Sequence, residues 1–245
     1  MVKKTNNLKS FTNLFRDSFK DLVQNPILVI PTVSLMVFMI AFSEISIKLS
    51  SFLAGRTLII WEICFLVIYF LAMSFFFSAL IGMGKDALKG KANLRTSFSY
   101  SKKFWLKNFL IMLLILALSQ LFKFGTIFGV NFIGLKLGLS PSYAQILYFL
   151  AYFASLAGIL IFLTFSSFYL IIYNLKVQES IKKSIAFVKK NYLYTLSILI
   201  IFFVISQVLS TYMGPLIRGF LLELINSVLI IPILSLVLTR FLRIN

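Results

Sequence analysis

The fold is decided by the pattern in residues 58–103, which read LIIWEICFLVIYFLAMSFFFSALIGMGKDALKGKANLRTSFSYSKK. The first 26 of these residues carry one charge, that of Glu62, and the next 20 carry six Lys or Arg side chains. About 20 apolar residues suffice for a helix to cross a bilayer, since the hydrocarbon is about 30 Å thick. A basic loop beside such a run is typical of the cytoplasmic side.

The same alternation extends outward along the chain. Four basic segments hold 19 of the 24 Lys and Arg residues, and these segments are residues 1–26, 84–107, 175–190 and 240–245. The remaining connections hold only Lys48, Arg56, Lys123, Lys136 and Arg218. The positive-inside rule therefore predicts a multi-pass protein of a prokaryotic cell membrane, with both termini in the cytoplasm.

We expect an all-α protein with six transmembrane helices, at about residues 27–49, 58–83, 104–123, 142–174, 193–212 and 217–242. The apolar runs are too long and continuous for the alternating strands of a membrane β-barrel. Residues 124–139 contain glycines at regular spacing, and we expect a flexible outer loop or a re-entrant piece there.

Three related stretches precede the first, third and fifth spans, and they are residues 11–27, 94–110 and 181–197. The last two align at an offset of 87 residues, which pairs Ser97 with Ser184 and Lys102–Lys103 with Lys189–Lys190. The first aligns at an offset of 83, which pairs Phe15 with Phe98 and Asn25 with Asn108. We expect a single membrane domain, 1–245, of three pseudo-repeats at about 1–86, 87–175 and 176–245. Each unit is a cytoplasmic amphipathic helix followed by a transmembrane hairpin.

The amphipathic helices are basic. In the third, an apolar stripe is expected along Ile181, Ile185, Val188 and Tyr192. A basic amphipathic helix beside a span is expected to lie at the headgroup level of the membrane. The candidate contacts to anionic lipid headgroups, or to an unidentified membrane or cytoplasmic protein partner, are Lys102, Lys103, Lys182, Lys183, Lys189 and Lys190. Simple anchoring and punctuation of the topology is the alternative role for these helices.

Charged residues inside the spans are few, and each is a candidate for function because burying a charge in the bilayer is costly. The candidates are Glu44, Glu62, Lys123 and Glu223, all expected in the outer third of the bilayer. They form either structural ion pairs at the outer interface or an outward-facing polar site.

Several classes of function are excluded by composition. The net charge of +17 is interleaved with bilayer-length apolar runs, which argues against nucleic acid as a partner. Histidine is absent, so metal sites with histidine ligands are excluded, and so is acid–base catalysis by histidine. The sequence carries no phosphate-binding loop. We expect no enzyme activity, no metal and no cofactor.

The segment Glu179–Tyr192, ESIKKSIAFVKKNY, resembles the lead-in helices of a group of six-span prokaryotic membrane proteins. That group includes the membrane domain attached to some glycerophosphodiester phosphodiesterases. The resemblance covers this segment and the repeat layout. The soluble phosphodiesterase domain has no counterpart here, and catalytic histidines are absent. The resemblance therefore implies architecture without activity.

The sequence predicts a non-enzymatic membrane accessory or scaffold that engages lipids or partner proteins through its basic cytoplasmic helices. A transporter or permease subunit is the alternative. A polar, water-accessible cavity that joins Glu44, Glu62 and Glu223 would favour this alternative.

Overall fold

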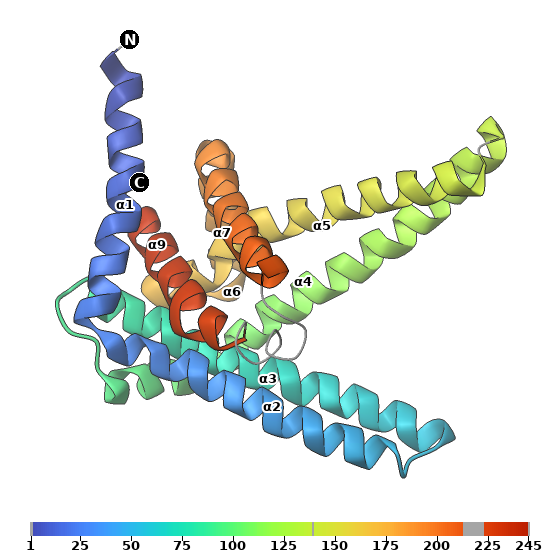
Figure 1. The fold of residues 1–245 in the computed structure, drawn as a ribbon, viewed down its shortest axis with the longest axis horizontal. Coiled ribbons are helices and arrows are strands. Elements are labelled where there is room, and N and C mark those ends of the chain that lie inside the picture. Colours follow the sequence, from blue (N-terminus) through green and yellow to red (C-terminus); the bar gives the residue numbers. More distant parts are fainter. Residues whose placement is uncertain (1, 139, 213–222, 245) are drawn as a thin grey trace.

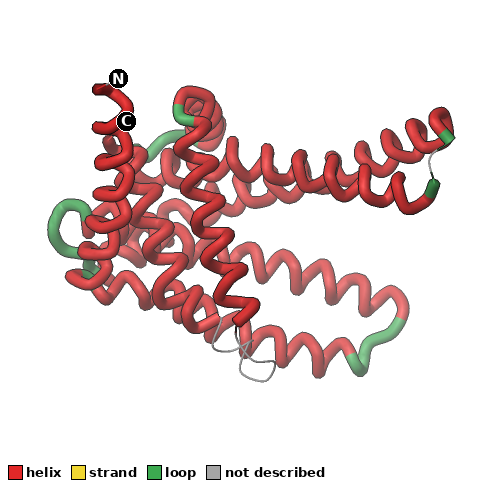
Figure 2. Tube along the Cα trace, turned by 45° about the horizontal axis from the view of Figure 1, so that its top comes forward, coloured by secondary structure: helices red, strands yellow, loops and turns green. Residues whose placement is uncertain are grey.

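The computed structural model describes residues 2–138, 140–212 and 223–244, which are helical apart from short connections (Figures 1 and 2). The elements are α1 (Val2–Gln24), η1 (Pro26–Val29), α2 (Ile30–Ser50), α3 (Gly55–Ala87), α4 (Leu94–Leu137), α5 (Pro141–Ile172), α6 (Val177–Lys190), α7 (Tyr192–Tyr212), η2 (Asn226–Ile230) and α9 (Ile231–Ile244). Within these ranges there is no strand, so the all-α prediction is confirmed for the described part of the chain.

Five helical segments are long and apolar enough to cross a membrane, and they are Pro26–Ser50, Gly55–Ala87, Leu94–Gly134, Ser142–Ile172 and Glu223–Ile244. A sixth is added if α6 and α7, which meet at 95°, form one bent span. The sequence predicted that the fifth span begins only after this bend. The described helices are thus compatible with a membrane protein of five to six spans.

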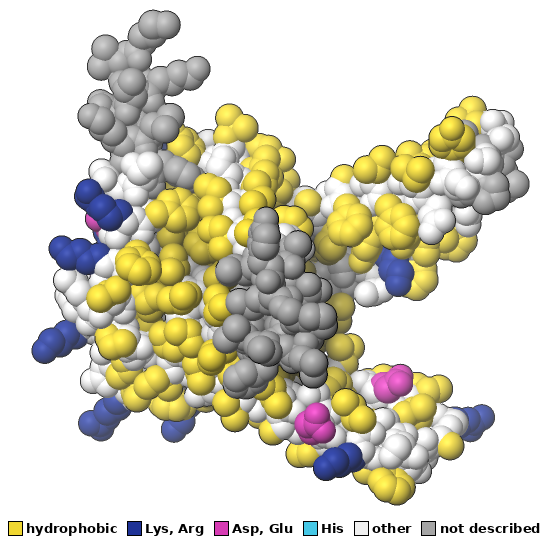
Figure 3. Space-filling view, in the orientation of Figure 1, with side chains coloured by type: hydrophobic (Ala, Val, Ile, Leu, Met, Phe, Trp, Pro, Cys, Tyr) yellow, Lys and Arg dark blue, Asp and Glu magenta, His cyan; other side chains and the backbone are white. Residues whose placement is uncertain are grey.

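Two antiparallel hairpins, α2–α3 and α4–α5, form long arms that diverge toward their tips (Figures 1 and 2). The arms meet at a common base, which we define as α1, the end of α3, the start of α4, the end of α5, α6 and α9. Figure 3 shows several Lys and Arg side chains along the α1 side of the molecule and others on the two arms. The four basic segments of the sequence lie on α1, on the end of α3 with the start of α4, on α6 and on α9, and contacts between these helices bring the segments together at the base.

Among the described residues, the larger of the two buried hydrophobic clusters lies in this base, where α5, α6 and α9 meet. The rings of Phe165 and Phe187 lie 4.8 Å apart, and those of Phe187 and Phe241 lie 5.4 Å apart. All three side chains are buried, whereas the arms expose large apolar side chains such as those of Phe52 and Phe128. Extensive apolar exposure is costly in water and is expected on a surface that faces lipid.

The prediction of a flexible outer loop or a re-entrant piece at residues 124–139 was wrong for residues 124–137, and residue 139 lies outside the described part of the chain. Helix α4 continues from Leu94 to Leu137, and Gly138 ends it in the left-handed conformation at φ 62°. The side chain of Asn93 caps its start by accepting a hydrogen bond from the backbone N–H of Arg95. Isolated glycines cost only about 1 kcal/mol each in a helix, so apolar neighbours override them. At about 1.5 Å per residue the 44 residues of α4 span roughly 66 Å. The predicted lead-in helix of the second unit is therefore continuous with its span.

Candidate functional site

The six predicted cytoplasmic lysines are all exposed, and they are Lys102, Lys103, Lys182, Lys183, Lys189 and Lys190. The first two lie in the opening turns of α4 and the other four on α6. The ammonium of Lys103 lies 5.2 Å from the ring centroid of Phe104, which is itself buried in the core. The base thus presents basic side chains on elements that are anchored by packing.

The buried face of helix α6 shares only Val188 with the predicted stripe. Its buried residues are Ser180, Ser184, Phe187 and Val188, whereas Ile181 and Ile185 are only partly buried and Tyr192 is exposed. The small serines allow α6 to approach α5 closely, and the hydroxyl of Ser184 donates to the carbonyl of Phe162 at 2.6 Å. The prediction was right for Val188 and wrong for the other three residues, because hydrophobicity alone was used to choose the buried face.

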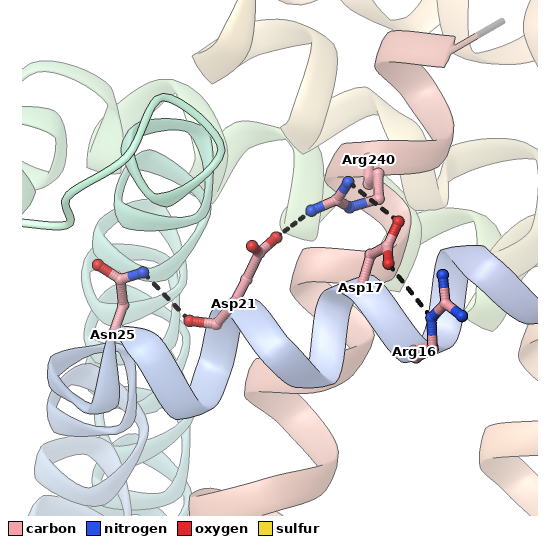
Figure 4. Close-up of polar contacts among 5 residues, drawn as sticks. All are labelled: Arg16, Asp17, Asp21, Asn25 and Arg240. Carbon is pink, nitrogen blue, oxygen red and sulfur yellow. Dashed lines mark hydrogen bonds and ion pairs between the residues drawn. The ribbon is translucent and has the colours of Figure 1, made fainter.

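An ion-pair cluster ties α1 to α9, and sequence reasoning missed it. Arg240 of α9 donates to the carboxylate of Asp21 and lies 3.8 Å from that of Asp17, both on α1 (Figure 4). Asp17 also meets Arg16 at 3.6 Å. The side chains of Arg240 and Asp21 are only 24% and 16% exposed. The sequence contains the i, i+4 carboxylate pair, but its partner lies 219 residues away from Asp21.

A second polar junction joins the inner ends of α3, α4 and α5. The ammonium of Lys85 donates to the carbonyl of Ile172 at 2.8 Å and lies 5.5 Å from the ring centroid of Tyr100. Asp86 accepts hydrogen bonds from Thr96 at 2.9 Å and from the Tyr100 hydroxyl at 3.3 Å. Lys85 and Asp86 therefore connect three helices of the base.

Buried serines and asparagines recur through the base at a spacing of 83 residues. The serines are Ser18, Ser101 and Ser184, and the asparagines are Asn25, Asn108 and Asn191. Each pair follows the pattern Ser-x6-Asn. A constant offset of 83 would have revealed them in the sequence, but the offset of 87 used for the later units concealed the third member.

The side chains of these residues form hydrogen bonds at the ends of helices and between neighbouring helices. The side-chain amides of Asn25 and Asn191 each donate to the carbonyl four residues earlier, at 3.1 Å, where α1 and α6 end. The carboxamide of Asn108, inside continuous α4, donates instead to the carbonyl of Ser74 at 3.3 Å and accepts from Ser167. The Ser101 hydroxyl donates to the Phe75 carbonyl at 2.9 Å.

The predicted outer residues are not brought together as one cluster. Glu44 on α2 and Glu62 on α3 are exposed on one arm, whereas Lys123 is exposed on α4 in the arm that diverges from it (Figure 1). Glu223 is exposed just before η2. Among the described residues, the salt bridges join Arg16 and Arg240 to aspartates and include none of the three glutamates. Arg218, one of the five cations outside the basic segments, lies outside the described residues.

Glu62 borders a cavity of 380 Å³ between α2 and α3. Its other lining residues are Ser46, Ile47, Ser50, Trp61, Phe65 and Leu66. The indole N–H of Trp61 donates to the Ser46 hydroxyl at 3.1 Å. Glu62 is the only carboxylate in this lining, and in the described ranges no three Cys, Asp or Glu side chains are grouped to hold a metal ion.

The fold defines an all-helical protein with several bilayer-length apolar helices. The chain belongs to the DUF7847 family, a domain of unknown function, whose match covers residues 11–242. Comparison with curated proteins and with solved structures gave no match.

Proposed function

We propose that this chain is a non-enzymatic multi-pass protein of the cell membrane. The positively charged side chains at its base engage anionic lipid headgroups. The chain serves as an accessory or scaffold component, with both termini in the cytoplasm. The observation that carries the proposal is the arrangement of α6. Its buried face is held by Ser184 and Phe187, while Lys182, Lys183, Lys189 and Lys190 remain exposed.

The energetics favour this role. A Lys or Arg near an anionic membrane surface contributes about 1 kcal/mol to attraction, and this term falls off within a Debye length. Several such charges on packed helices act together without a large cost in ordering, since the hydrogen bond of Ser184 to α5 and the burial of Phe187 already hold α6 in place. A cytoplasmic protein with an acidic surface is the second candidate partner.

We also propose that the chain consists of three pseudo-repeated units, at about 1–86, 87–175 and 176–245. The Ser-x6-Asn pattern at residues 18–25, 101–108 and 184–191 supports it and refines the period to 83 residues. In this scheme the asparagine lies between the amphipathic helix and the span that follows. The first and third units bend there, and the second continues as α4.

Orientation is tested by reporter fusions. Fusions after residues 90, 180 and 245 are expected to report cytoplasm, and fusions near 54, 138 and 215 the exterior. A reversed reporter at any of these sites would overturn the six-span topology.

A transporter or permease subunit is the alternative, and the cavity beside Glu62 is the observation in its favour. Substrate and coupling-ion sites of secondary transporters lie near the bilayer midplane beside discontinuous helices. This cavity lies between the continuous helices α2 and α3, and neither Glu44 nor Lys123 lines it, which is why we favour the accessory role.

Lipid engagement is tested with a variant in which Lys102, Lys103, Lys182 and Lys183 are replaced by Gln. Wild type and variant are purified from vesicles of equal phosphatidylglycerol and phosphatidylcholine, and the co-purified lipids and proteins are measured by mass spectrometry. We expect enrichment of phosphatidylglycerol in the wild type and its loss in the variant. Equal lipid composition in both would overturn the proposal. Recovery of a stoichiometric soluble ATPase, when the wild type is instead purified from its cells in a mild detergent, would support the transporter.

A further inference from the structure

An apolar cavity of 610 Å³ lies among α3, α5, α7 and α9. Its volume falls within the range of about 300–1,000 Å³ typical of ligand pockets. Fourteen of its sixteen lining residues are apolar, and the other two are Thr164 and Ser235. The Thr164 hydroxyl donates to the carbonyl of Leu160 in its own helix, so the wall offers few polar groups to a ligand.

The cavity is long. Along α5 its lining extends from Phe153 to Phe168, which corresponds to roughly 22 Å at about 1.5 Å per residue. One leaflet contributes about half of the 30 Å hydrocarbon thickness. The cavity can therefore accommodate an extended hydrocarbon chain. The lining of α7, from Leu196 to Phe203, and that of α9, from Ile231 to Leu238, lie alongside.

Positive charge lies beyond one end of the cavity on three different helices. Lys85 follows Phe77 by eight residues on α3, Lys190 precedes Leu196 by six, and Arg243 follows Leu238 by five on α9. The ammonium of Lys85 already donates a hydrogen bond to the Ile172 carbonyl. The side chains of Lys189, Lys190 and Arg243 are exposed. The opposite end of the lining is apolar, at Phe153, Phe203 and Ile231.

An apolar cavity with cations beyond one end is complementary to an amphiphile with an anionic headgroup. A membrane phospholipid reaches such a site laterally from the bilayer, because the cavity lies between helices of bilayer length. A water-soluble ligand would leave its polar groups without partners along the wall, which is costly.

We propose that this cavity binds one acyl chain of an anionic phospholipid whose phosphate lies against Lys189, Lys190 and Arg243. The inference rests on the proposed engagement of anionic lipid at the base and adds a specific, stoichiometric site to it. The bound lipid fills the space between the α4–α5 arm and α7, so it stabilises the relative position of these elements.

The test fills the cavity with a side chain. Ala157 lines it, and Ala154, one turn earlier on α5, is exposed and does not. Ala157→Phe and the matched control Ala154→Phe are reconstituted with equal phosphatidylglycerol and phosphatidylcholine, delipidated in detergent and analysed by native mass spectrometry. We expect wild type and Ala154→Phe to retain one phosphatidylglycerol per chain, and Ala157→Phe to lose it at least tenfold.

Retention of the lipid by Ala157→Phe would overturn the inference, and so would retention of phosphatidylcholine as readily as phosphatidylglycerol. A further variant, Lys189→Gln with Lys190→Gln, is expected to keep a lipid but lose the headgroup preference. The four-lysine variant described above spares these two residues. Bulk lipid enrichment therefore tests the proposed function, and the single retained lipid tests the cavity.

Discussion

The ammonium group of Lys85, in the last turn of α3, donates a hydrogen bond of 2.8 Å to the carbonyl of Ile172, the last residue of α5. The final carbonyls of a helix have no partner within the helix and carry partial negative charge, so a cation there is stabilising. This contact joins the inner ends of two helices that belong to different arms.

Replacing Lys85 with Met keeps the aliphatic stem and removes the charge. A charge-assisted hydrogen bond contributes about 1.5–3 kcal/mol, and partial exposure of Lys85 places the expected loss near the lower limit. We expect a lower Tm in a thermal unfolding assay in detergent. Lys89→Met, at an exposed position on the same basic segment, is the control and should leave Tm unchanged.

Gly82 is a site where a methyl group cannot be accommodated. A Cβ there would lie 2.3 Å from Cδ2 and 2.7 Å from Cβ of Tyr100, so α4 itself must shift. Overpacking of this kind costs about 1–3 kcal/mol. We expect Gly82→Ala to lower Tm markedly, whereas Gly84→Ala, whose nearest contact is 3.4 Å to Thr239, should change it little. Adding Tyr100→Ala to Gly82→Ala should restore part of the loss. Additive effects in this double-mutant cycle would contradict the assigned contact.

Arg240 holds α1 against α9, and Arg240→Met leaves Asp17 and Asp21 without their cation. Because the pair is partly buried, we expect a loss of about 2 kcal/mol, seen first as release of α1. Limited proteolysis near residues 16–24 should accelerate in the variant. Combining it with Asp21→Asn should recover part of the protection, and an unchanged cleavage rate in Arg240→Met would contradict the cluster.

The three serines at positions 18, 101 and 184 are all buried but differ in bonding. Ser101 and Ser184 donate to carbonyls of α3 and α5, whereas the Ser18 hydroxyl has no partner among the described residues. We expect Ser184→Ala and Ser101→Ala each to cost about 1 kcal/mol. Ser18→Ala should be neutral or stabilising, because it removes an unsatisfied polar group. Equal losses at all three positions would mean that packing rather than hydrogen bonding explains their burial.

Much of the helical layout could be predicted, and the reason is local. An apolar run such as residues 58–83 must satisfy its backbone hydrogen bonds internally in lipid, so it forms a helix whatever lies beside it. In the structure this run forms part of α3, which extends beyond it at both ends, from Gly55 to Ala87. The loop predicted at residues 124–139 failed because glycine spacing was weighed above the surrounding apolar residues, which continue α4 to Leu137.

The sequence by itself determined that the chain is helical, that its helices are long and apolar, and that its lysines gather on alternate connections. These properties depend on composition and period along a single segment. Only the tertiary structure decided that Arg240 meets Asp21, that Ser184 rather than Ile185 faces the core, and that Glu62 and Lys123 lie on separate arms. Such pairings depend on which helix faces lie together, and hydropathy does not encode this because a lipid-facing side and a packed side are both apolar.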